Sequence, residues 1–157
     1  MSTAHMSTPQ RLAVGFLAGV LAVIVFHQGA ILVLRETGLF GFPRTAPVWN
    51  LAANPRAFGL PVLVNQCFWG GLYGAAFAWL TTRVRIGTLP LALMTGAATT
   101  LVGFFVIASL RGTPIAGGWQ AMAWLRGLSI GLSFGLGLWI FYTAITSRRF
   151  PPPLPRR

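Results

Sequence analysis

The chain has 157 residues, of which 55% are hydrophobic and only 8% are charged. Its twelve basic residues are all arginine, its only acidic residue is Glu36, and its formal net charge is +11. This composition excludes an ordinary soluble domain, whose helices keep one polar face, and it provides no carboxylate pair for acid–base catalysis.

Four long apolar runs, none with an internal charge, follow one another at residues 12–34, 57–82, 86–110 and 127–147. A helix needs about 20 apolar residues to cross the hydrocarbon core of a bilayer. The sequence therefore predicts an all-α integral membrane protein, a four-helix bundle with a single membrane domain over 12–147. The first run is longer than the apolar core of a signal peptide, so we expect it to remain as a helix.

The positions of the arginines predict the orientation. Between or beyond alternate runs, one side holds Arg11, Arg83, Arg85, Arg148, Arg149, Arg156 and Arg157, and the other holds Arg35, Arg44, Arg56, Arg111 and Arg126. Positive residues favour the cytoplasmic side, which places the N-terminal segment 1–11 and the tail 148–157 in the cytoplasm, with mixed insertion as the alternative. Arginines at the ends of spans form no basic face, and so no nucleic-acid partner is expected.

The two long polar segments differ in character. The loop 35–56 contains three prolines and several aromatic residues, and we expect it to lie on the membrane surface with Trp49 as an interfacial anchor. The tail reads FPPPLPRR, which predicts polyproline-like or disordered chain after the last helix.

A short pattern occurs twice, seventy residues apart. Trp49-Asn50-x-x-Ala53-x-x-Arg56 is repeated as Trp119-Gln120-x-x-Ala123-x-x-Arg126. The repeat predicts two duplicated two-helix units with the same orientation; chance similarity in a biased composition is the alternative. Arg56, Trp119 and Arg126 are further candidate interfacial anchors, since an arginine near the end of a span reaches the headgroups by snorkelling. A buried, ligand-binding Arg126 is the alternative.

Small residues recur every four positions within the spans. The candidate helix-packing residues are Gly70 and Gly74 in the second run, and Gly127, Gly131 and Gly135 in the fourth. Stacked small residues let helix backbones approach closely, and close approach drives association inside a bilayer. The pattern predicts tight packing within the bundle and a face for a partner, either a second copy or another membrane protein.

A candidate polar layer lies at similar depth in all four runs: His27, Gln28, Asn65, Gln66, Thr99, Thr100 and Ser133. Polar groups buried in a membrane either bind a ligand, ion or proton or form hydrogen bonds between helices. Both interpretations remain open for this layer, and His27 is the best single candidate for a functional residue.

Other chemical signals are weak. Ser129 and Ser133 each lie in a GxSxG pattern, but a nucleophile elbow requires a strand-to-helix turn. Two histidines, one cysteine and one glutamate are too few for a three- or four-ligand metal site in one chain. We therefore expect no catalytic residues, no metal and no cofactor.

The stretch Phe58-Gly59-Leu60-Pro61, with Phe68-Trp69-Gly70-Gly71-Leu72-Tyr73-Gly74 after it, resembles small four-span inner-membrane proteins of Gram-negative bacteria, a group with no assigned function. The resemblance implies a multi-pass inner-membrane protein. With few reactive groups and many small-residue faces, the sequence favours an accessory, assembly or structural element of a membrane complex. A small oligomeric channel or transporter that uses His27, Gln28, Asn65 and Gln66 is the alternative.

Overall fold

A computed structural model describes residues 6–149; residues 1–5 and 150–157, which include most of the predicted tail, lie outside the described part. Within 6–149 every regular element is a helix, apart from an isolated antiparallel bridge between Ala53 and Pro61. The elements are α1 (Thr8–Ala22), η1 (Val23–His27), α2 (Gln28–Thr37), η2 (Leu39–Gly41), η3 (Pro55–Ala57), α3 (Val62–Leu80), α4 (Thr88–Leu101), η4 (Val102–Ile107), α5 (Ala108–Leu110), η5 (Ile115–Trp119) and α6 (Ala121–Arg149).

The first helix is continuous through α1, η1 and α2. It begins at Thr8, four residues before the predicted run, because Ser7 and Gln10 form a capping box in which each side chain accepts a hydrogen bond from the other's main-chain N–H. It ends at Gly38, whose left-handed conformation (φ 67°) closes the helix. Its middle segment, η1, is a π-helix. A second π-helix, η4, joins α4 to α5 in the same way.

The second and fourth apolar runs have different boundaries from those expected. α3 begins at Val62 rather than near residue 57, because Phe58 and Gly59 have positive φ angles that no α-helix accommodates. α6 begins at Ala121, before Arg126, so this arginine lies in the second turn of the helix and not ahead of it. The pattern of apolar residues located the helices but not their first turns.

Three helices are long and apolar enough to cross a membrane: Thr8–Thr37, Thr88–Leu110 and Ala121–Ser147. The expectation of four such helices is therefore met only in part. α3 has 19 residues, which is almost enough for a crossing. Unlike the other three helices, it also carries two adjacent side-chain amides near its start, Asn65 and Gln66.

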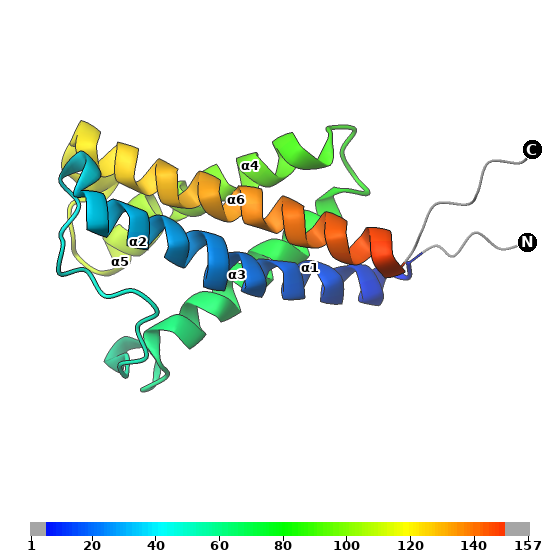
Figure 1. Ribbon diagram of the computed structural model, residues 1–157, viewed down its shortest axis with the longest axis horizontal. Coiled ribbons are helices and arrows are strands. Elements are labelled where there is room, and N and C mark those ends of the chain that lie inside the picture. Colours follow the sequence, from blue (N-terminus) through cyan, green and yellow to red (C-terminus); the bar gives the residue numbers. More distant parts are fainter. Residues whose placement is uncertain (1–5, 150–157) are drawn as a thin grey trace, which may run out of the picture.

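The helices run up and down through an elongated bundle (Figure 1). The start of α1, the turn between α3 and α4 and the end of α6 share one end, and the segments 38–61 and 111–120 lie at the other (Figure 1). Within residues 6–149, Arg11 lies at the first of these ends and Arg126 at the other; Arg156 and Arg157 lie outside the described residues. α3 is strongly tilted, so its beginning lies away from α2.

The two most extensive helix contacts are α1 with α3 and α4 with α6, and α1 also packs on α6. Small residues bring each pair together: a Cβ added at Gly19 would lie 2.8 Å from the carbonyl carbon of Gly70, and one added at Gly135 would lie 2.5 Å from the carbonyl oxygen of Ala92. Contacts this close require glycine, as the four-residue spacing predicted. The core between the pairs includes the edge-to-face rings of Phe77 and Tyr142, with centroids 5.2 Å apart.

Candidate functional site

The most deeply buried polar side chain of the described chain is Gln28, which is only 2% exposed. Its Nε2 donates to Oε1 of Gln66 on α3 at 2.9 Å and lies 3.4 Å from Nδ1 of His27. Its Oε1 accepts the main-chain N–H of Trp49 at 2.8 Å. One amide therefore joins the first helix, the following loop and α3.

The π-helix η1 ends beside this amide. In η1 the N–H of Gln28 donates to the carbonyl of Val23, five residues earlier, a geometry that is rare and often found at functional positions. The carbonyl of Ile24, in the same wide turn, accepts the indole N–H of Trp49 at 2.8 Å. The main-chain N–H and the indole N–H of Trp49 thus both donate to the first helix.

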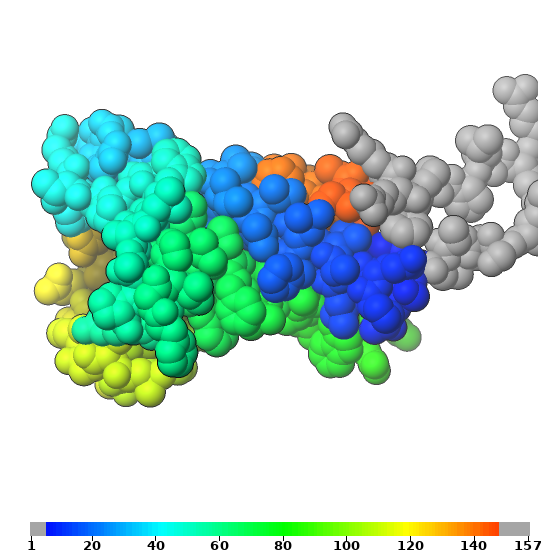
Figure 2. All heavy atoms as spheres, turned by 90° about the horizontal axis from the view of Figure 1, so that it is seen from below, coloured from blue at the N-terminus to red at the C-terminus, as the bar shows by residue number. Residues whose placement is uncertain are grey.

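Trp49 is the first residue of an inserted segment, residues 49–52, that lies between the first helix and the start of α3. On the α3 side, the carbonyl of Asn50 accepts the N–H of Leu63 at 2.9 Å, and that of Ala52 accepts the N–H of Val62 at 3.1 Å. The inserted segment therefore satisfies first-turn N–H groups of α3 that no residue of the helix can satisfy. Figure 2 shows the surrounding loop, in cyan and teal, spread along the green surface of α3.

Trp49 has a positive φ of 47°, a strained conformation for a large side chain. The two hydrogen bonds to Gln28 and Ile24 hold it in place. The structure thus places Trp49, which we expected to act as an interfacial anchor, against the helices, although 42% of its surface remains exposed.

The expected polar layer divides into separate groups. His27, Gln28 and Gln66 come together, whereas the structure gives the half-buried side chains of Asn65 and Ser133 no hydrogen bond within residues 6–149. Thr99 donates to the carbonyl of Gly96 in its own helix. Thr100 joins α4 to α6 by donating to the carbonyl of Gly127 at 2.9 Å.

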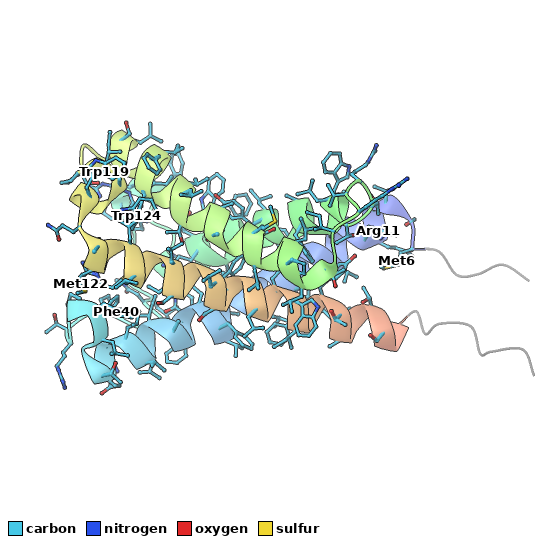
Figure 3. The ribbon with its side chains drawn as sticks, turned by 90° about the horizontal axis from the view of Figure 1, so that it is seen from above. Met6, Arg11, Phe40, Trp119, Met122 and Trp124 are labelled. Carbon is cyan, nitrogen blue, oxygen red and sulfur yellow. The ribbon has the colours of Figure 1, made fainter. Side chains whose placement is uncertain are left out.

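The other candidate anchors lie at the same end of the bundle. Arg56 is exposed in η3, and Trp119 is 74% exposed, with its ring stacked on that of Trp124 at 6.4 Å (Figure 3). Arg126 donates from Nη1 to the carbonyl of Gly41 at 3.1 Å, which ties α6 to the loop after α2. The ribbon shows Phe40 of η2 beside Met122 of α6 in the same region (Figure 3).

The predicted helix-packing glycines all lie at helix contacts. Gly70 and Gly74 of α3 face Gly19 and Gly15 of α1. On α6, Gly131 and Gly135 face the backbone of α4, and Gly127 faces the side chains of Thr100 and Phe104. Each set therefore belongs to a contact inside the chain.

The two copies of the repeated pattern agree at their first residue and then differ. Trp49 and Trp119 both adopt the left-handed conformation, with φ angles of 47° and 57°. After Trp49 the chain continues as the inserted segment and η3, whereas after Trp119 it enters α6 within two residues. The two copies therefore share the conformation of their first residue but not the structure that follows it.

Sequence reasoning missed the carbonyl of Ile24 and the π-helix that presents it, because hydrophobic periodicity does not distinguish a π turn from an α turn.

The described residues contain no group of three histidine, cysteine or acidic residues that could hold a metal ion. What the site can do chemically is hydrogen bonding through neutral amides and one imidazole. Comparisons with protein-family models, with curated proteins and with solved structures gave no match to this chain.

Proposed function

We propose that this chain is a four-span bacterial inner-membrane protein with both termini in the cytoplasm, and that it serves as a non-catalytic accessory or assembly element of a membrane complex. The main support for the proposal is that the side-chain amide of Gln28 forms its hydrogen bonds within the chain, to Gln66 and Trp49. A polar group with its donors and acceptor already engaged stabilises the fold and is poorly placed to take up a ligand.

The alternating direction of the helices supports a fourth crossing by α3. Its length of 19 residues corresponds to about 28 Å of helix. The polar Gln66 would enter the bilayer already bound to Gln28, which reduces the cost of its burial. Counted along the sequence, the N-terminal segment, the turn between α3 and α4 and the C-terminal tail together hold seven arginines against five in the other two connections, which supports a cytoplasmic location for the former.

An exposed apolar face on the outer half of α3 supports a partner. Its residues Val64, Phe68, Trp69 and Leu72 are 41–52% exposed, and the rings of Phe68 and Trp69 meet edge to face at 5.7 Å. Preformed aromatic pairs are typical centres of protein interfaces. We propose that this face packs against another membrane protein or a second copy of the chain.

The test is native mass spectrometry of the chain purified from its own membrane in mild detergent. A stoichiometric foreign subunit, lost in Phe68→Ala and Trp69→Ala but retained in the lipid-facing control Met94→Ala, is the expected result. Met94 is 58% exposed on α4 and is thus a comparable apolar side chain elsewhere. Purification of the chain alone, or equal loss in all three variants, would contradict an accessory role that uses this face.

A small oligomeric channel or transporter is the second candidate, because His27, Gln28 and Gln66 do lie together. In that case the side chains of His27, Gln28 and Gln66 would select the solute that passes. Flux into vesicles that contain the purified chain separates the two functions. Altered flux in Gln66→Leu would favour the channel, and no flux above empty vesicles would exclude it.

A further inference from the structure

A surface hollow of about 410 Å³ lies at the end of the bundle opposite the start of α1. Its lining comes from η4 and α5, from the loop 111–118, and from the first turns of α6. Its polar lining includes Arg111, Thr113, Gln120 and Arg126, and its apolar floor includes Phe104. The hollow is large enough for a phosphate group with a small polar substituent.

The two arginines of the hollow have no carboxylate available in this chain. Glu36 is the only acidic residue of the sequence, and it pairs with Arg35 at 2.6 Å. Arg126 uses one of its five N–H donors on the carbonyl of Gly41. Within residues 6–149 the structure gives the guanidinium of Arg111 no hydrogen-bond partner. The hollow therefore presents two positive charges and several donors to whatever enters it.

The start of α6 adds to this positive potential. Gln120, directly before the helix, and Ala123, in its first turn, line the hollow, and the N–H of Ala123 donates to the carbonyl of Gln120 at 2.9 Å. A 29-residue helix carries a partial positive charge at its N-terminus, where the first N–H groups lack partners in the helix. Two guanidinium groups around one space, near the positive end of a helix dipole, form a site for a phosphate or a similar oxyanion.

Exposed apolar side chains adjoin the lining residues along the chain and bear on which anion fits. Leu110, directly before Arg111, is 79% exposed, and Trp119, directly after Gly118, is 74% exposed beside Phe105. A free anion gains no binding energy from these apolar side chains, whereas the acyl chains of a phospholipid would pack against them. Leu110 ends a helix that is long and apolar enough to span a membrane, which places Arg111 near headgroup depth.

We propose that this hollow, which we call the Arg111–Arg126 hollow, binds the phosphate headgroup of an anionic phospholipid. The guanidinium groups of Arg111 and Arg126 contact the phosphate oxygens, and the acyl chains lie along Leu110, Phe105 and Trp119. The site is distinct from the Gln28 amide group and does not depend on the accessory function proposed above.

The experiment uses the full chain, purified in a neutral detergent, with phosphatidylglycerol, phosphatidylcholine or inorganic phosphate as the probe. Native mass spectrometry measures the lipid bound at each concentration in the parent chain, in Arg111→Gln, in Arg126→Gln and in Arg56→Gln. Arg56 is the matched control, because it is an exposed arginine at the same end that does not line the hollow. Thermal unfolding in the same detergent shows whether each variant is folded.

We expect phosphatidylglycerol to bind more tightly than phosphatidylcholine, and Arg111→Gln to weaken it about tenfold, the effect of losing one charge-assisted contact. Arg56→Gln should leave binding unchanged, and Arg111→Lys should retain most of it because the charge remains. If Arg126→Gln is unfolded through loss of its bond to Gly41, the Arg111 variants still decide the question.

Equal affinity for the two lipids, or equal weakening in Arg56→Gln and Arg111→Gln, would overturn the proposal. Competition separates a lipid from a free anion as the occupant. Millimolar inorganic phosphate that displaces phosphatidylglycerol completely would show that the hollow binds the anion without the acyl chains, and this too would overturn the lipid assignment.

Discussion

The side-chain amide of Gln28 donates a hydrogen bond of 2.9 Å to the side-chain carbonyl of Gln66, a residue 38 positions later on a helix that diverges from its own. The same side chain accepts the main-chain N–H of Trp49, so a single amide connects three segments. The amide is almost completely buried, and its removal would leave two partly buried partners without these hydrogen bonds.

Gln28→Leu should therefore lower the free energy of unfolding in detergent by about 2–3 kcal/mol, since it removes two hydrogen bonds and leaves partly buried groups unsatisfied. The matched control is Gln120→Leu, because Gln120 is exposed at the start of α6. A loss in Gln120→Leu as large as that in Gln28→Leu would contradict a special role for Gln28.

Trp49→Phe should destabilise the protein by about 1 kcal/mol, because it removes the donor to the carbonyl of Ile24 but keeps an aromatic ring. Trp119→Phe is an unusually close control. Trp119 shares the left-handed conformation, yet it is 74% exposed, and the structure gives its indole N–H no acceptor within residues 6–149. Equal melting temperatures for the two variants would show that the bond to Ile24 contributes little.

Gly19→Ala should separate α1 from α3 and cost about 1–3 kcal/mol, since the new methyl group would meet the backbone of Gly70. Gly29→Ala, on the same continuous helix, is the control because its Cβ would meet nothing within 4 Å. It should be neutral or slightly stabilising, as alanine favours helix. Denaturation of both variants in one detergent measures the difference directly.

Single cysteines can test the proposed fourth crossing. Cys67 is the only native cysteine, so Cys67→Ala provides a background without reactive thiols. If α3 crosses the membrane, Thr45→Cys and Thr82→Cys lie on opposite sides, and both positions are exposed in the structure. A membrane-impermeant maleimide should label Thr45→Cys in cells with a permeable outer membrane, but Thr82→Cys only after the inner membrane is opened. Complete labelling of both before the inner membrane is opened would place them on one side and contradict the crossing.

The all-helical fold and the approximate position of each helix could be predicted from the sequence, because long apolar runs without charges allow few alternatives. The packing glycines could also be identified, since stacked small residues have a simple physical meaning. Helix starts were harder to predict. The capping box at Ser7 extends the first helix backwards, and the positive φ angles at Phe58 and Gly59 delay α3.

The candidate site could be predicted only in part. Depth in the membrane brought His27, Gln28 and Gln66 into one expected layer, and the structure places them together. Depth does not describe rotation about the helix axis, however, and so it could not separate Asn65 and Ser133 from that group. The role of Trp49 depends on the path of a long loop and on a π turn, for which the sequence carries no periodic signal.

The inserted segment has a mechanical consequence for α3. Gly70 and Gly74 hold α3 in close contact with α1. Residues 49–52 bind the first turn of α3 and lie between it and the first helix. The inclination of α3 is therefore set by a loop and not by helix packing alone. Displacement of this segment would remove the hydrogen bonds that connect the first turn of α3 to the first helix, and would leave the start of α3 held only by its remaining contacts.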